Sequence, residues 1–196
     1  MADILYRTHP LESRKAALAR PIDGLSMHAE DSVAAVDLRV DPAGPGADAV
    51  GRSLGTALPI EPNTWTHTAD GQIIWLGPDE WLVTSTEARP EDFEDELSWV
   101  VSAFDGAAVD VSAQRTSLRL RGPLVRELLS FGCALDLRPS AFPAGCCAQT
   151  IVGQSGVLIL ALGQDDFRIF VRQSFAGYFA DWLLDAAQEF LPGLSN

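Results

Sequence analysis

The sequence predicts an α+β protein built on an internally duplicated module, in the order strand, helix, strand, strand, helix. Three observations predict this architecture: a turn motif occurs twice, apolar residues recur at strand or helix spacing, and polar turns separate these segments. We expect mostly antiparallel sheets with helices on one face. Since half of the chain buries only a marginal core, we also expect the modules to pack as one pseudo-twofold domain.

The duplication is carried by a hairpin motif that appears in both halves. Leu76-Gly77-Pro78-Asp79-Glu80-Trp81 corresponds to Leu162-Gly163-Gln164-Asp165-Asp166-Phe167. In each copy an apolar run enters a polar turn and an aromatic residue opens the next run, which is typical of a hairpin on a type I turn. A second block, residues 53–62, corresponds to residues 130–139 with a different offset, which indicates one inserted loop at residues 141–145.

The first module is expected over residues 33–105. Alternating apolar residues predict a strand that ends before Asp41, and Gly55 is placed to end the following helix in the left-handed conformation. Pro90 and the acidic residues after it suit the positive end of a second helix. The expected strands and helices lie at 36–40, 47–54, 65–68, 72–76, 81–84 and 90–104.

The second module is expected over residues 106–196 and repeats this order. Gly122 and Pro123 are predicted to start its first helix, Gly132 to end it, and Ser174 to cap its last helix. The expected strands and helices lie at 118–121, 124–131, 148–152, 157–162, 167–172 and 174–190.

Residues 1–32 form a leader rich in Arg, Pro, His and Ala, within which a short helix over 11–20 is possible. It has too few large apolar residues for a core of its own, so it is either a loose tail or an arm that orders against another protein. We favour a partner-binding arm, and we expect one or two of the five tryptophans to anchor the same interface. The candidate interface residues are Tyr6, Arg7, Arg14 and Arg20.

Composition limits the classes of partner. The 27 acidic residues exceed the 14 basic ones and give a net charge of −13, which argues against nucleic acid and against an anionic membrane surface. We find neither a long apolar run nor a signal sequence, so we expect a cytoplasmic protein. The three cysteines, Cys133, Cys146 and Cys147, suit neither a disulfide framework nor a zinc site.

The sequence offers little chemistry for an active site. Two of the three histidines, His9 and His28, lie in the leader, and no Ser/His/Asp or Cys/His arrangement is visible. The segment at 44–46 lacks the third glycine and the lysine of a phosphate-binding loop, and the paired carboxylates at 79–80 and 165–166 are interpreted as turn residues. We therefore predict no catalytic, cofactor-binding or metal-binding residue in this chain.

Several segments match one known family in order and spacing. They are Asp110-Val111-Ser112, Leu118-Arg119-Leu120-Arg121-Gly122-Pro123, Cys133-Ala134-Leu135-Asp136-Leu137 with Pro139, Ala141-Phe142-Pro143, Trp75-Leu76-Gly77-Pro78-Asp79-Glu80-Trp81-Leu82-Val83 and the second hairpin motif. With them, the chain resembles the gamma subunit of bacterial heterotetrameric sarcosine oxidase over about residues 33–190.

The resemblance implies a non-catalytic subunit that supports a flavoprotein complex. That complex oxidatively demethylates sarcosine to glycine, with hydrogen peroxide and 5,10-methylenetetrahydrofolate as products. The resemblance also implies a heterotetramer in which this chain binds primarily the alpha subunit, with beta and delta subunits present. FAD, FMN, NAD and tetrahydrofolate are expected on the other subunits, and none on this chain.

The second half is also similar to the folate-binding fold of the glycine-cleavage aminomethyltransferase. In that family a carboxylate near the strands serves the folate chemistry, whereas Val157-Leu158-Ile159-Leu160-Ala161-Leu162 carries none. Two alternatives stay open. One is a free-standing folate-binding enzyme or iron-sulfur assembly factor of this fold, whose Lys-Gly-Cys-Tyr-x-Gly-Gln signature is faintly echoed at residues 145–149. The other is a homo-oligomeric binding module of unknown ligand.

Overall fold

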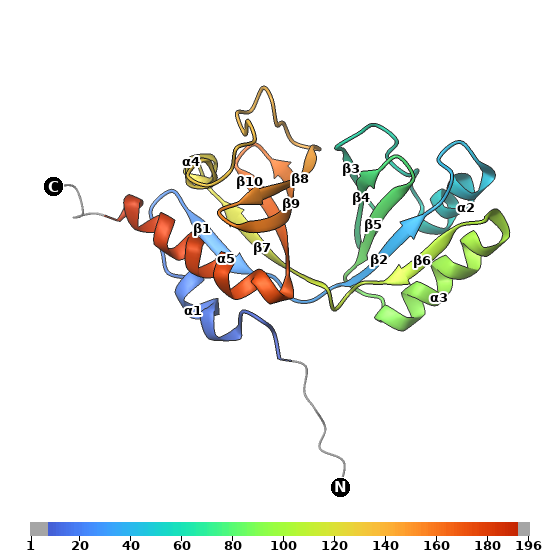
Figure 1. Ribbon diagram of the computed structural model, residues 1–196, viewed down its shortest axis with the longest axis horizontal. Helices are drawn as coiled ribbons and strands as arrows, with labels where there is room; N and C mark the ends of the chain where they lie inside the picture. Colours follow the sequence, from blue (N-terminus) through green and yellow to red (C-terminus); the bar gives the residue numbers. More distant parts are fainter. Residues whose placement is uncertain (1–7, 192–196) are drawn as a thin grey trace, which may run out of the picture.

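The computed structural model describes residues 8–191, which form two five-stranded antiparallel sheets (Figure 1). The sheets have the strand orders β3-β4-β5-β2-β6 and β8-β9-β10-β7-β1. The strands are β1 (Ser26–Ala29), β2 (Ala34–Arg39), β3 (Trp65–His67), β4 (Gly71–Gly77), β5 (Glu80–Ser85), β6 (Ala107–Asp110), β7 (Arg115–Arg121), β8 (Cys147–Val152), β9 (Ser155–Gly163) and β10 (Asp166–Arg172). The α-helices are α1 (Lys15–Leu18), α2 (Pro45–Leu54), α3 (Pro90–Val101), α4 (Val125–Ser130) and α5 (Gln173–Ala186), with short 3-10 helices at Glu12–Arg14, Ser102–Phe104 and Ala187–Phe190.

The helices cover the outer face of each sheet (Figure 1). Helices α2 and α3 lie on the first sheet, where Val36 and Leu38 of β2 point into the core, and α1, α4 and α5 lie on the second sheet. The opposite faces of the two sheets pack on each other through a third apolar cluster. The predicted duplicated α+β module, with helices on one face and mostly antiparallel sheets, is therefore confirmed.

Local sequence explains several element ends. Pro45 and Pro90 occupy the first turns of α2 and α3, where a missing backbone N–H is harmless, and α3 carries Glu91 and Asp92 in its first turn. Gly55 adopts φ 71° just after α2, as predicted for a left-handed residue that ends a helix. These features fix where each helix begins or ends along its sheet.

The two modules exchange one strand each. Strand β1 precedes the first module in sequence but pairs with β7 of the second sheet, and β6 is the first strand of the second module but pairs with β2 of the first sheet. The two connecting segments cross near the middle of Figure 1. Hydrogen bonds join the second segment to β2: Val111 N donates to Ala35 O at 2.8 Å, and Ala35 N donates to Ser112 Oγ at 2.8 Å. Each sheet therefore contains one strand, β1 or β6, that lies on the other side of a predicted module boundary, at residue 33 or 106.

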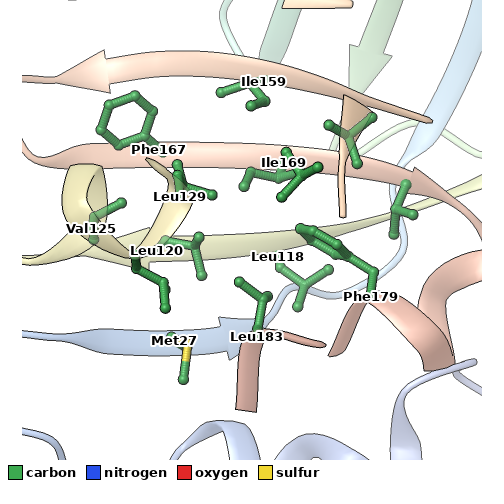
Figure 2. Close-up of a cluster of buried hydrophobic side chains, with 14 of the residues drawn as sticks. Met27, Leu118, Leu120, Val125, Leu129, Ile159, Phe167, Ile169, Phe179 and Leu183 are labelled. Atoms are coloured by element: carbon green, nitrogen blue, oxygen red, sulfur yellow. The ribbon is translucent and has the colours of Figure 1, made fainter. Parts of the chain in front are cut away.

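The described part of the leader, residues 8–29, packs on the second module, and its expected role as a partner-binding arm stays a prediction. The side chains of Leu11, Leu18, Leu25 and Met27 are buried in the core of the second module. Figure 2 shows Met27 in the same cluster as Leu118 and Leu120 of β7. The leader has no core of its own, as predicted, but it completes the core of another module. Tyr6 and Arg7 lie outside the described residues.

Two predicted helix ends also differ. Helix α5 begins at Gln173 without a side-chain cap, so Ser174 is inside it. Helix α4 begins at Val125 and ends at Ser130, and Gly132 does not take the left-handed conformation. A Cβ atom at Gly132 would lie 2.5 Å from Trp182 Cζ2 and 2.9 Å from Gly153 N. Glycine is required there because a side chain would collide with its neighbours.

Candidate functional site

The space between the two sheets is the first candidate for a ligand site. Its centre is filled by apolar side chains from both modules: Ala35, Ile74, Leu82, Val111, Cys147, Leu158, Leu160 and Phe170. Beside this layer, a groove holds two adjoining cavities of about 300 and 420 Å³ that share Gly71, Thr86 and Arg168. The groove is therefore the part of the interface that remains open.

An ion-pair network lies along this groove. Arg168 of β10 donates from Nε to Glu30 Oε2 at 2.6 Å and from Nη2 to Glu30 Oε1 at 2.8 Å. Its Nη1 donates to Gln72 Oε1 of β4 at 2.6 Å, so one guanidinium links the second sheet to the first. Arg119 donates both Nε and Nη2 to Asp166. Every charged partner in this network is already paired with another.

Electrostatics keep these acids ionised. Burial alone would raise the pKa of Glu30, but hydrogen bonds and charge attraction from Arg168 outweigh it and leave the pKa lowered. Asp166 behaves the same way, with Arg119 lowering a pKa that burial would raise. Neither carboxyl therefore suits proton transfer near neutral pH.

The groove residues do not fit a folate. Leu158, Leu160 and Leu162 are the side chains that β9 directs toward the facing sheet, and they belong to the apolar cluster between the sheets. The nearby guanidiniums of Arg119 and Arg168 are held by Asp166 and Glu30.

The remaining chemistry-bearing residues have structural contacts. The His9 ring contacts Glu30 O at 3.0 Å and Thr116 Oγ1 at 3.1 Å through Nε2, which fastens the start of the described chain to β7. His67 is exposed and meets Trp65 edge-on, with ring centroids 4.6 Å apart. Across residues 8–191, no group of three or more His, Cys, Asp or Glu side chains could hold a metal ion. In the same range, no helix has the length and apolar character needed to cross a membrane.

The paired carboxylates at the two hairpin turns make equivalent ion pairs. Glu80 faces Arg39 across β5 and β2, with Arg39 Nη2 2.5 Å from Glu80 Oε2. Asp166 faces Arg121 across β10 and β7, with Arg121 Nε 3.3 Å from Asp166 Oδ2. The duplication thus extends to an arginine-carboxylate pair that holds each hairpin against its neighbouring strand.

The three cysteines are free thiols. Burial raises the pKa of Cys147 to about 12, and its Sγ lies 3.3 Å from Thr64 O. Burial also raises the pKa of Cys146. Neither thiol has the lowered pKa of a reactive cysteine.

The structure describes two of the predicted interface residues, Arg14 and Arg20. Arg14 forms a bidentate pair with Asp181 of α5, at 2.7 and 2.8 Å, and so fastens the N-terminal segment to the second module. Arg20 is exposed two residues after α1. Tyr6 and Arg7 are not among the described residues. Of the two described residues, Arg14 is held by Asp181 and Arg20 is exposed.

Exposed apolar side chains are candidates that sequence reasoning missed. Trp99 is 83% exposed and Ile60 is 71% exposed. On α3 the buried residues are Phe93, Leu97 and Val101, so Trp99 lies off the apolar stripe. That displacement is visible in the sequence and could have identified Trp99 as a surface residue.

Comparison with known proteins gives consistent matches. Residues 39–189 match the model of the sarcosine oxidase, gamma subunit family. Sarcosine oxidase subunit gamma of Corynebacterium sp. (strain P-1) is 32% identical over 156 residues, which cover 79% of this chain and 76% of the relative. Sarcosine oxidase subunit gamma of an Arthrobacter species is also 32% identical over 156 residues, with the same coverage.

Two solved structures also match this chain. A chain of the heterotetrameric sarcosine oxidase from Corynebacterium sp. U-96, in complex with pyrrole 2-carboxylate, has a TM-score of 0.87 and 27% identity, and the match covers 97% of this chain and 99% of that one. The glycine cleavage system aminomethyltransferase T from Bartonella henselae has a TM-score of 0.61 and 16% identity, over 90% of this chain and 50% of that one. The second likeness shows the fold alone and confirms the predicted aminomethyltransferase-like architecture.

Proposed function

Because the chain belongs to the sarcosine oxidase gamma subunit family, we propose that it is the non-catalytic gamma subunit of a heterotetrameric sarcosine oxidase. One observation carries the proposal: the match to a chain of such a heterotetramer covers 97% of this chain and 99% of that one. A structural role agrees with an inter-sheet space that is packed by apolar side chains and bridged by the hydrogen bond from Arg168 to Gln72.

In this role the chain supports a complex that oxidatively demethylates sarcosine to glycine, with hydrogen peroxide and 5,10-methylenetetrahydrofolate as products. Its primary partner is the alpha subunit, and beta and delta subunits complete the heterotetramer. FAD, FMN, NAD and tetrahydrofolate are held by these other subunits. The three free cysteines support a reducing compartment, the cytoplasm.

Part of the partner interface is assigned to the N-terminal segment, at Tyr6, Arg7, Arg14 and Arg20. Arg20 tests this best, because Arg14 also pairs with Asp181 and its loss would disturb the second module. Arg20→Glu is expected to weaken assembly, with Arg52→Glu, a charge reversal at another exposed arginine, as the control. Equal assembly of both variants would remove this segment from the interface.

The function itself is tested by affinity purification of the tagged chain from its native cells. We expect co-purified larger chains, identified by mass spectrometry, with flavin absorbance and sarcosine-dependent production of hydrogen peroxide. A colourless single chain would overturn the proposal. Tetrahydrofolate titration and light-scattering mass measurement of that chain would then separate the folate-binding and homo-oligomeric alternatives.

A further inference from the structure

An apolar pocket of about 440 Å³ opens on the surface of the first module, away from the groove between the sheets. Its lining residues are Pro42, Ala43, Ile60, Pro62, Trp75 and Pro78. Three prolines and a tryptophan restrict the conformations of the lining, and Ile60 is 71% exposed. Such a surface loses little conformational entropy when another side chain enters it.

Hydrogen bonds hold the three loops that form this pocket. Trp81 Nε1 donates to Pro59 O at 2.8 Å, which fixes the loop that carries Ile60 over β5. Val40 N donates to Asp79 O at 3.2 Å and ties the end of β2 to the hairpin turn. The third loop is closed by Ala43 N donating to Asp41 Oδ1 at 3.0 Å. The pocket is therefore formed before any occupant arrives.

Three acidic residues are next in sequence to residues that line the pocket, and we call them the rim acids. Asp41, Glu61 and Asp79 each adjoin a lining proline in the sequence, and all three are exposed. The neighbouring cation is Arg39, whose Nη1 lies 3.6 Å from Asp79 Oδ1 and whose Nη2 pairs with Glu80. Three acids against one shared arginine make the rim attractive to a basic side chain.

The second module shows what fills the corresponding place. In the duplicated sequence Leu137 corresponds to Ile60 and Asp165 to Asp79, yet Leu137 is only 5% exposed. Phe142, from the loop that the first module lacks, stacks on Phe167 with ring centroids 6.4 Å apart. This module therefore covers its own apolar surface with an aromatic ring.

An arginine accompanies that ring. Arg126 lies over Phe167, with its Cζ 4.8 Å from the ring centroid. It donates to Gln164 O at 2.9 Å and to Leu137 O, and it lies 3.8 Å from Asp165 Oδ1. It thus neutralises the acid that corresponds to Asp79 and satisfies the carbonyls of the turn.

The first module has neither group. Its sequence lacks the inserted loop, and Ala49 stands at the position of Arg126. Trp75 corresponds to Ala161, and each pairs across the strands with the aromatic residue of its own hairpin, Trp81 or Phe167. The pocket beside Trp75 is nevertheless open. The first module therefore has the apolar surface and the acid without the ring and the guanidinium.

We propose that this pocket receives an apolar side chain adjacent to an arginine from another subunit of the oxidase. The partner then completes the first module as Phe142 and Arg126 complete the second. This inference rests on the proposed function, because it takes the occupant from the same complex. The apolar side chain fills the space beside Ile60 and Trp75, and the arginine pairs with the rim acids.

The test measures assembly of the full-length chain with the larger subunits when all are co-expressed. Ile60→Glu places a charge in the pocket and Ala43→Trp fills it, so each is expected to weaken assembly at least about tenfold. Ile151→Glu, at a residue 61% exposed on β8, is the matched control and should assemble like wild type. Glu61→Gln should weaken assembly less and flatten its dependence on salt. Unchanged thermal unfolding temperatures show that the variants fold.

The outcomes separate the two proposals. If wild type recovers the larger subunits and both Ile60→Glu and Ala43→Trp recover them equally well, the pocket proposal is overturned and the proposed function stands. If these variants instead abolish self-association of the chain and leave recovery unchanged, the occupant is a second copy and the proposal is again overturned. If wild type recovers no larger subunit, both proposals fail.

Discussion

Leu18→Ala tests whether the N-terminal segment is an integral part of the fold. Leu18 lies in α1, has no exposed surface and packs in the core of the second module. Replacing a buried leucine by alanine costs about 2.7 to 5.0 kcal/mol through lost burial and the cavity that remains. Since α1 is a single turn of four residues, the site can partly collapse. We therefore expect a loss near the low end, about 3 kcal/mol.

The free energy of unfolding would be measured by urea titration, followed by tryptophan fluorescence. Leu191→Ala is the control, because Leu191 is 39% exposed and its truncation should cost less than about 0.5 kcal/mol. A loss below about 1 kcal/mol for Leu18→Ala would refute the structure of this segment. It would mean that residues 8–29 detach in solution and behave as the arm that composition predicts.

Three further predictions concern other contacts. Glu30→Gln should cost about 2 kcal/mol at pH 7, because Arg168 loses the charge of a partner whose side chain is only 16% exposed. The folded-state pKa of Glu30 lies below its ordinary value of 4.5, so the difference in unfolding free energy between wild type and Glu30→Gln should shrink as pH falls through that folded-state pKa. A difference that is independent of pH in urea titrations would contradict this. Gly71→Ala should lower the unfolding temperature by several degrees, because the added methyl group on β4 collides with the Thr84 carbonyl of β5. Gly156→Ala is the control: its methyl group meets no atom within 4 Å, so the unfolding temperature should change little. Cys147, with a pKa of about 12, should resist iodoacetamide at pH 8 until the chain is unfolded, and rapid labelling in mass spectra of the native protein would count against its burial.

The sequence was sufficient for elements whose own residues carry a strong pattern. Alternating apolar residues located β2 and β7, and Gly55 marked the end of α2. Strands β1 and β6 were missed because they are short and depend on partners far away in the chain. Strand β6 holds two alanines and one valine, and a sequence this small forms a strand only because β2 provides its hydrogen bonds.

The candidate sites were harder to predict for a related reason. From the sequence, Asp79 is interpreted as a residue that favours the hairpin turn. The structure shows that the neighbouring Pro78 also lines a pocket. One signal was present in the sequence, namely the loop containing Phe142 that only one module possesses. Its meaning depends on what the ring covers, which requires the stacking on Phe167 to be seen.

The exchanged strands have a consequence for how such a chain can be divided. A polypeptide of one repeat would extend its first strand beyond its own sheet and leave that sheet one strand short. Two such polypeptides would complete each other, so the present chain corresponds to a strand-swapped dimer whose subunits are joined end to end. Joining them makes completion of both sheets independent of concentration, whereas a dimer of separate halves would come apart on dilution.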